Sequence, residues 1–324
     1  MKIETRFTKL VDTELPIVGG AMMDISKADF VAAISDAGAL GVLASAIYKD
    51  YGEFRDDIKA VKDKTDKPFA VNINLFPMMN KLDNNKYLEI MKEEGVNIVE
   101  MSGFAPPEEL VSKVKSYGMT WIHKCVGVRY ARKAEALGAD AVTVVGYENG
   151  GATGNLNVTT MVLVPSTVHA VSMPVIGGGG IVDGASLLAV LSLGASGAIV
   201  GTRLLMSEEC PIHRSLKEKL LEATETDTAV IMRSVGFAHR VWLNGPARKV
   251  VEIEAQGGDD ILPKIYPYVS GESAKKMFDT GDTEAGSISL SQGIGLIREI
   301  KPVREILHEM VEQALEIHRA LPFG

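Results

Sequence analysis

Eight short apolar runs, separated by segments with helical patterning, constrain the fold of this chain most strongly. Each run is rich in β-branched residues, is bounded by Gly, Pro or polar residues, and lacks the alternation of a half-exposed strand. Such runs suit parallel strands that are buried on both faces. In chain order they are LPIVGGAMM, ALGVLASA, PFAVNINLF, NIVEMSG, MTWIHKCVG, DAVTVVGYE, PVIGGGG and GAIVGT.

The segments between the runs have the signals of amphipathic helices. PEELVSKVKSYG begins after a proline, has acidic residues first and lysines later, and stops at Gly118; KADFVAAISDAG and VRYARKAEALG also stop at a glycine. These patterns match the helix dipole and glycine C-caps. The alternation predicts an α/β fold of the (β/α)8 TIM-barrel type. A doubly wound sheet is the alternative, because a sequence does not show closure.

The strand–helix rhythm breaks after about residue 206. We therefore expect residues 1–206 plus about 284–324 to form the barrel, and about 207–283 to form a helical and irregular insertion, the cap segment, over the substrate. Within it, HRSLKEKLLEATETDTAVI reads as one amphipathic helix, and the stretch from about Arg233 to Thr283 reads as Gly- and Pro-punctuated. The C-terminal segment IKPVREILHEMVEQALEIHRAL reads as a further amphipathic helix.

Composition excludes several classes of protein. The net charge of -8 argues against nucleic acid or anionic membrane as a partner. The two cysteines form no C-x-x-C pair, so neither a disulfide scaffold nor a metal site is expected. No run is long enough to span a membrane, and the N-terminus lacks a signal-peptide pattern, so a cytoplasmic protein is expected.

The glycine run GGGGIVDG follows the seventh predicted strand, and GAIVGT forms the eighth. In barrels the loops after these strands often bind phosphate, because bare backbone N–H groups can approach its oxygens. We expect such a site at Gly178, Gly179, Gly180, Gly201 and Thr202. The alternative is a tight turn without a ligand. Neither a Rossmann fingerprint nor a P-loop motif is present.

Several motifs resemble those of the nitronate monooxygenase family, which includes the flavin-dependent enoyl-ACP reductase FabK. They are PIVGGAMM, KPFAVNINL, DAVTVVGYENGGATG, PVIGGGGIVDG, GAIVGTRLL and GSISLSQGIGLI, in family order. The resemblance implies FMN at the barrel mouth, with its phosphate on the glycine loops. It places the flavin ring along Gly20, Ala21 and Met22, near Asn72. It also implies that the segment with Gln292 and Gly293 returns to the flavin. Without the resemblance, Met22 reads as core packing and Asn72 as a strand-end turn.

One family position departs from the pattern. The family motif after the sixth strand carries a proton-transferring His, and Ala152 occupies that position in ENGGATG. Alanine cannot move a proton. This argues against the interpretation as a standard nitronate monooxygenase and against the interpretation as a close copy of FabK. Gly151 and Glu148 in the same loop are expected to contact the cofactor, and Thr153 could replace part of the lost hydrogen bonding.

The fifth predicted strand offers replacement groups. His123 and Cys125 face one way and Lys124 the other, because strand side chains alternate. Lys124 inside the barrel could bind flavin or an anion, or act as an acid; the alternative is an ion pair with an acid such as Glu148. His123 could be the acid, or could pack against a helix, and Cys125 is expected to pack.

The cap segment contains two further candidates for the site. His239 and Arg240 could reach the flavin from there. We read them instead as a packed ring and a surface charge.

The favoured function is an FMN-dependent oxidoreductase that takes hydride from NAD(P)H and reduces an enoyl thioester, a quinone or a similar conjugated acceptor. The first alternative is a monooxygenase that oxidises alkyl nitronates with O2. Others are a flavin-free barrel that binds a phosphorylated metabolite, and a flavin-binding regulator without turnover. The C-terminal helix packs on the barrel or, in a homodimer, on a second subunit.

Overall fold

All eight predicted runs form parallel strands in a computed structural model, which describes residues 2–48, 50–76, 83–103 and 105–322. Each strand is short and almost entirely buried, as expected when helices cover the sheet. The strands are β1 (Ile17–Gly19), β2 (Gly41–Ala44), β3 (Phe69–Asn74), β4 (Ile98–Ser102), β5 (Thr120–Cys125), β6 (Ala141–Val145), β8 (Val175–Gly178) and β9 (Gly197–Val200).

The sheet closes into a barrel. Its strand order is β1-β9-β8-β6-β5-β4-β3-β2, and a parallel bridge between Val18 and Leu40 joins the two ends. Leu40 donates its N–H to Ile17 O and accepts from Gly19 N, both at 2.9 Å. The (β/α)8 prediction is confirmed and the doubly wound alternative is wrong, because closure leaves no strand-order reversal.

The barrel interior holds an apolar plug, which is drawn mostly from the half of each strand where it begins. Helix α1 (Arg6–Val11) inserts Phe7 there, and a Cβ atom built on Gly197, the first residue of β9, would lie 2.9 Å from its ring. The opposite mouth, where the strands end, is left for the functional site. The plug consists of Phe7, Val11, Val18, Leu40, Val42, Ala70, Ile98, Ile122, Ala141, Val145, Ile176 and Ile199.

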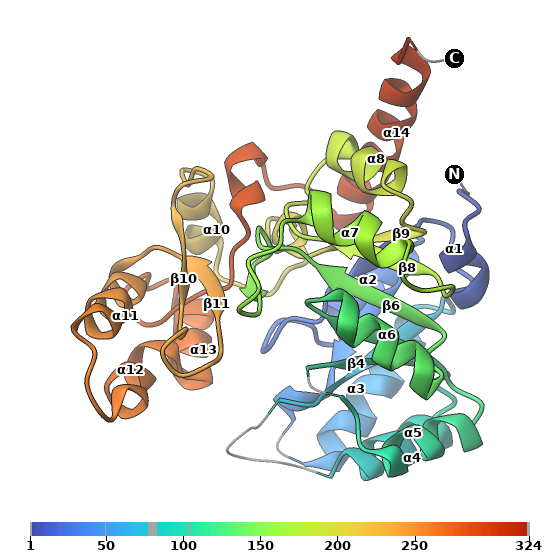
Figure 1. Cartoon of the computed structure of the whole chain (residues 1–324), viewed down its shortest axis with the longest axis horizontal. Coiled ribbons are helices and arrows are strands. Elements are labelled where there is room, and N and C mark those ends of the chain that lie inside the picture. Colours follow the sequence, from blue (N-terminus) through green and yellow to red (C-terminus); the bar gives the residue numbers. More distant parts are fainter. Residues whose placement is uncertain (1, 49, 77–82, 104, 323–324) are drawn as a thin grey trace.

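Helices cover the outside of the barrel (Figure 1). Their ends follow the sequence signals: α5 begins after Pro107, and α6 ends at Gly138, whose φ of 91° is left-handed. The covering helices are α2 (Ala28–Asp36), α3 (Tyr51–Lys64), α4 (Asn84–Glu93), α5 (Glu108–Ser116), α6 (Val128–Leu137), α7 (Thr160–Val168), α8 (Gly184–Ser192), α9 (Thr202–Leu205) and α14 (Val303–Ala320). Two 3-10 turns, Ser45–Ile47 and Gln292–Leu296, complete this part.

The cap segment lies to one side of the barrel (Figure 1) and has a small apolar cluster of its own. Its residues 228–231 form a strand rather than the end of the expected helix, which stops at Leu220. The Gly- and Pro-punctuated stretch from about Arg233 to Thr283 is mostly helical. The elements are α10 (Arg214–Leu220), β10 (Thr228–Ile231), β11 (His239–Trp242), α11 (Gly245–Gln256), α12 (Ile261–Val269) and α13 (Gly271–Thr280). No helix in the described ranges is long and apolar enough to cross a membrane.

Candidate active site at the barrel mouth

A layer of polar side chains lies directly above the apolar plug. Side chains two positions apart on a strand share a face, so the residues that follow Ala70, Ile98, Ile122 and Ala141 by two positions also face inward. The β3–β4 and β5–β6 registers place them side by side. These interior positions are Asn72, Glu100, Lys124 and Thr143.

Glu100 is the centre of this polar layer. Its Oε1 accepts from Lys124 Nζ at 2.9 Å and from Asn72 Nδ2 at 2.7 Å, and Asn72 also donates to Ser102 Oγ at 3.0 Å. Glu100 is 1% exposed, and its Oε2 has no hydrogen-bond partner in the described structure. Thr143 Oγ1 is buried and unpaired in the same sense. Buried polar atoms of this kind are normally satisfied, so these two atoms are candidate contacts for a polar ligand.

Lys124 therefore faces inward and pairs with Glu100; an ion pair was one of the alternatives, with Glu148 as its example, and the acid found is a different one. Glu148 instead uses Oε2 to accept from the N–H and the hydroxyl of Thr160, both at 3.0 Å, and so satisfies the first turn of α7. Glu100 was not among the site residues expected from the sequence. Its signal was an acid two positions after Ile98 inside an apolar strand.

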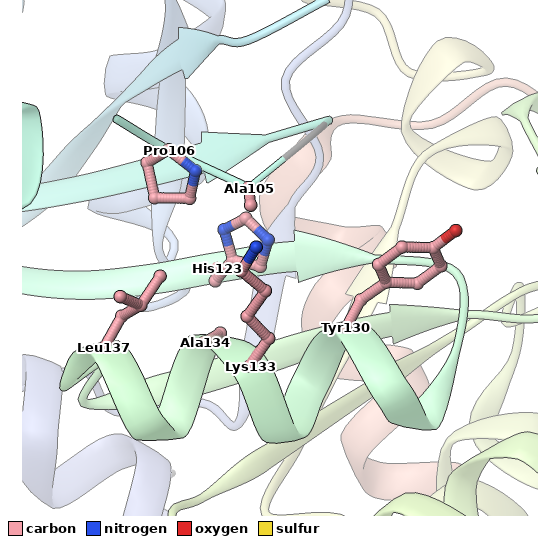
Figure 2. Close-up of a pocket in the computed structure, with 7 residues that line it drawn as sticks. All are labelled: Ala105, Pro106, His123, Tyr130, Lys133, Ala134 and Leu137. Carbon is pink, nitrogen blue, oxygen red and sulfur yellow. The ribbon is translucent and has the colours of Figure 1, made fainter. Parts of the chain in front are cut away.

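His123 lies on the opposite face of β5, away from Lys124. It lines a small pocket between β5 and α6 with Tyr130 and Lys133 (Figure 2). Burial lowers the pKa of His123 to about 4, and its Nδ1 has no partner in the described residues. This placement does not favour a catalytic role for His123. Burial also raises the pKa of Cys125 to about 12, so that thiol is no nucleophile.

The glycine loops form a bare-backbone cradle beside the polar layer. Gly179 and Gly180 have φ values of 111° and 73°, a region that glycine adopts without strain. A Cβ built on Gly178 would lie 2.2 Å from Ile199 Cγ2, whereas one on Gly201 would meet nothing within 4 Å. Gly201 thus borders open space, whereas Gly178 has no room for a side chain and Gly179 and Gly180 adopt the left-handed backbone that favours glycine.

The segment around Gln292 contacts the loops of this cradle. Ser291 N donates to Thr202 Oγ1 at 2.9 Å, and Gln292 N donates to Glu148 O at 3.1 Å. A Cβ on Gly293 would lie 3.2 Å from Gly180 O. These contacts bring together loops that are distant in sequence.

The loop after β1 lies at the same end of the barrel. Gly20 N donates to Val200 O at 2.9 Å, and Met22 N donates to Ser26 Oγ at 2.9 Å. Ala21 packs against the apolar plug, and Met22 against the outer core. This loop therefore borders the cradle.

The loop after β6 carries Ala152 and pairs with the cap segment. Strand β7 (Gly151–Ala152) is antiparallel to β11, with His239 opposite Ala152 and Arg240 opposite Gly151. Arg240 was expected at the surface but is 3% exposed, because it donates to Tyr147 O and Thr228 Oγ1.

The nitronate monooxygenase family model matches residues 4–313. The chain belongs to the nitronate monooxygenase family. A 5-hydroxy-7a-methyl-1-oxo-octahydro-1H-indene-4-carboxyl-CoA dehydrogenase of Rhodococcus jostii is 37% identical, over 97% of this chain and 96% of the relative. A probable nitronate monooxygenase of Bacillus subtilis is 27% identical, over 94% and 96%. The structure of FabK from Thermotoga maritima superposes with a TM-score of 0.89 at 33% identity, covering 98% of each chain.

Membership in the nitronate monooxygenase family makes this chain an enzyme, and it makes Ala152 informative. The proton-transferring His that the family resemblance led us to expect there is replaced by a methyl group. Any polar group that acts on the substrate at this position must come from another element.

Proposed function

We propose that this enzyme is an FMN-dependent oxidoreductase that takes hydride from NAD(P)H and reduces an enoyl thioester or a similar conjugated acceptor. The observation that carries the proposal is the arrangement at one barrel mouth of a bare-backbone cradle and an inward-facing cation, Lys124. A flavin mononucleotide needs both a phosphate site and polar groups for its ring edge.

The residues at the mouth fit FMN on two counts. The open space above Gly201 and the left-handed Gly179 and Gly180 suit the phosphate. The unpaired Glu100 Oε2 and Thr143 Oγ1 suit a planar group with both donors and acceptors. Gly20, Ala21 and Met22 would supply the wall along the ring, with Gly151, Gln292 and Gly293 closing the mouth.

When bound, the flavin would supply hydride transfer between the nucleotide and the acceptor. Lys124 would hold positive charge beside the ring edge, where negative charge accumulates on reduction. Glu100 fixes the position of that cation, and Asn72 fixes the carboxylate through its Nδ2 donor. The apolar plug below excludes water from the inner side of the site.

The thioester class of acceptor is supported by two relatives. The Rhodococcus relative is named for a carboxyl-CoA substrate, and the superposed FabK belongs to the enoyl-ACP reductases. Ala152 argues against the alternative, oxidation of nitroalkanes by proton abstraction at that position. Oxidation of nitronates that are already anionic remains the second candidate, favoured by the family model and the Bacillus relative.

The first experiment is an anaerobic absorbance titration of the purified protein with NADH and, separately, NADPH. We expect flavin bands that bleach with one nucleotide and recover on addition of an enoyl thioester. Bands that neither nucleotide bleaches would contradict the reductase and direct attention to nitronates. A colourless protein that FMN does not reconstitute would contradict the cofactor.

A Gly201 series tests the cradle independently of turnover. A Cβ at Gly201 meets no protein atom within 4 Å, so Gly201→Ala and Gly201→Val should leave the cofactor-free fold intact. We expect FMN affinity to fall in that order, as the side chain fills the phosphate space. Unchanged FMN affinity in Gly201→Val, measured by fluorescence titration, would place the phosphate elsewhere.

A further inference from the structure

The imidazole of His239, in the cap segment, lies opposite Ala152, the position where the family motif carries a histidine. His239 on β11 is the register partner of Ala152 on β7, and Thr153 N donates to Ala238 O at 3.1 Å beside them. Directly opposite residues of an antiparallel pair point to the same side, with Cβ atoms about 4.5–5.5 Å apart. The two side chains therefore share one location at the mouth.

The His239 ring is held in a defined orientation. One ring nitrogen, Nε2, lies 2.8 Å from Ser289 Oγ, and a Cβ on Gly151 would lie 3.7 Å from Cε1. Ser289 bridges to Val241, and its neighbour Ser291 contacts Thr202 of the cradle. The ring is thus tied to the same segment that closes the cradle.

The surroundings keep this ring uncharged. His239 is half-buried, and burial lowers its pKa to about 4. Of the charged groups on the packed elements, Arg240 donates through Nε to Tyr147 O and through Nη1 to Thr228 Oγ1, while its Nη2 is buried without a partner in the described structure, and Glu148 accepts from Thr160. Either atom of the contact between Ser289 Oγ and Nε2 can be the donor, depending on the tautomer; in the neutral tautomer that the proposal uses, Ser289 donates and Nε2 accepts. Nδ1 then carries the ring hydrogen, and no described residue accepts it.

We propose that His239 is a catalytic residue whose neutral Nδ1–H donates a hydrogen bond to the thioester carbonyl oxygen of the substrate. The proposal rests on the proposed function. Hydride addition to the β-carbon moves the C=C electron pair toward that oxygen as an enolate, and a fixed donor stabilises the charge. No proton leaves the imidazole in this step; solvent supplies the proton that the α-carbon gains. A neutral histidine can serve as such an electrophile.

The experiment compares His239→Ala, His239→Gln and the exchange variant Ala152→His/His239→Ala. The control is His169→Ala, at an exposed histidine after α7. We expect kcat for enoyl-thioester reduction to fall about 100- to 1000-fold in His239→Ala, with a smaller change in KM. His239→Gln should retain part of the rate because its amide is a donor. The exchange variant should recover at least about tenfold, since the register places both side chains together.

Two further readouts separate donation of a hydrogen bond from a structural or acid role. The 15N spectrum of histidine-labelled protein without cofactor, assigned with His239→Gln, should show a neutral Nδ1–H tautomer at pH 7 that Ser289→Ala redistributes. His239 should contribute no inflection to the pH profile of kcat, so the profiles of the wild type and His239→Ala should have the same shape. An imidazolium at pH 7, or such an inflection, would overturn the proposal.

The outcomes distinguish this inference from the proposed function. If the wild type turns over and His239→Ala has the same kcat, the role of His239 is overturned but the proposed function stands. The same holds if the exchange variant recovers none of the lost kcat. Absence of wild-type reduction with either nucleotide overturns both. If His239→Ala unfolds, as shown by its melting temperature, the 15N spectrum of the wild-type protein decides instead, and an imidazolium or an Nε2–H tautomer at pH 7 overturns the proposal.

Discussion

At the scale of single residues, the site depends on one buried charge pair. Glu100 is almost fully enclosed and would be left without its cation if Lys124 were neutral. Removing one partner of a buried pair generally costs far more than removing both. Lys124 therefore stabilises the fold by compensating the buried charge of Glu100, in addition to any contact with the cofactor.

A double-mutant cycle tests this coupling. We expect Lys124→Met to lower the free energy of unfolding by about 3 kcal/mol, because Glu100 is then buried and unpaired. Adding Glu100→Gln should restore much of the stability but not the activity. Urea unfolding of the four proteins measures the cycle, and additive losses would show that the pair is not coupled.

At the scale of elements, close backbone approach joins the barrel to its C-terminal helix. A Cβ on Gly184, the first residue of α8, would lie 2.5 Å from Ala314 N and 2.6 Å from Met310 O of α14. Gly184 N also donates to Gln313 Oε1 at 2.7 Å. In this structure the apolar face of α14 is buried on its own barrel.

Gly184 is accordingly a packing position and not a functional one. We expect Gly184→Leu to destabilise the protein by about 1–3 kcal/mol, because the side chain forces α8 and α14 apart. Thermal unfolding measures the effect, with Leu188→Ala on the same helix as a comparison. A melting temperature equal to that of the wild type would mean that the helices can separate freely.

Sequence patterns predicted elements far better than they predicted contacts between them. The helix stops at Gly118 and Gly138 follow from backbone chemistry within a few residues, and the structure shows both. The strand at 228–231 was missed because only its pairing with β11 makes it a strand. Tertiary pairing overrides local propensity most readily in such short segments.

At the scale of the whole molecule, the buried imidazole of His123 makes stability depend on pH. The pKa of His123 falls from 6.5 to about 4 on folding, so the unfolded state binds the extra proton between these values. Stability is therefore fully present above pH 6.5 and is lost as pH falls toward 4. The shift corresponds to about 3 kcal/mol for this one group.

His123→Leu should flatten that pH dependence without affecting turnover. The variant removes the titrating ring and its unpaired Nδ1 from a site on the outer face of β5. Denaturant unfolding at pH 7 and pH 4.5 measures the slope for both proteins. Equal slopes would contradict the linkage, and a large loss of activity would restore His123 as a catalytic candidate.

The sequence by itself determined the barrel, the glycine cradle and the family. Apolar runs, helix ends and glycine requirements are local, and each is imposed by a few neighbouring residues. Only the tertiary structure decided which face of β5 looks inward, that Glu100 is the partner of Lys124, and that His239 lies opposite Ala152. Alternation fixes the faces of a strand relative to each other, but closure of the sheet and docking of the cap segment decide which face meets the site.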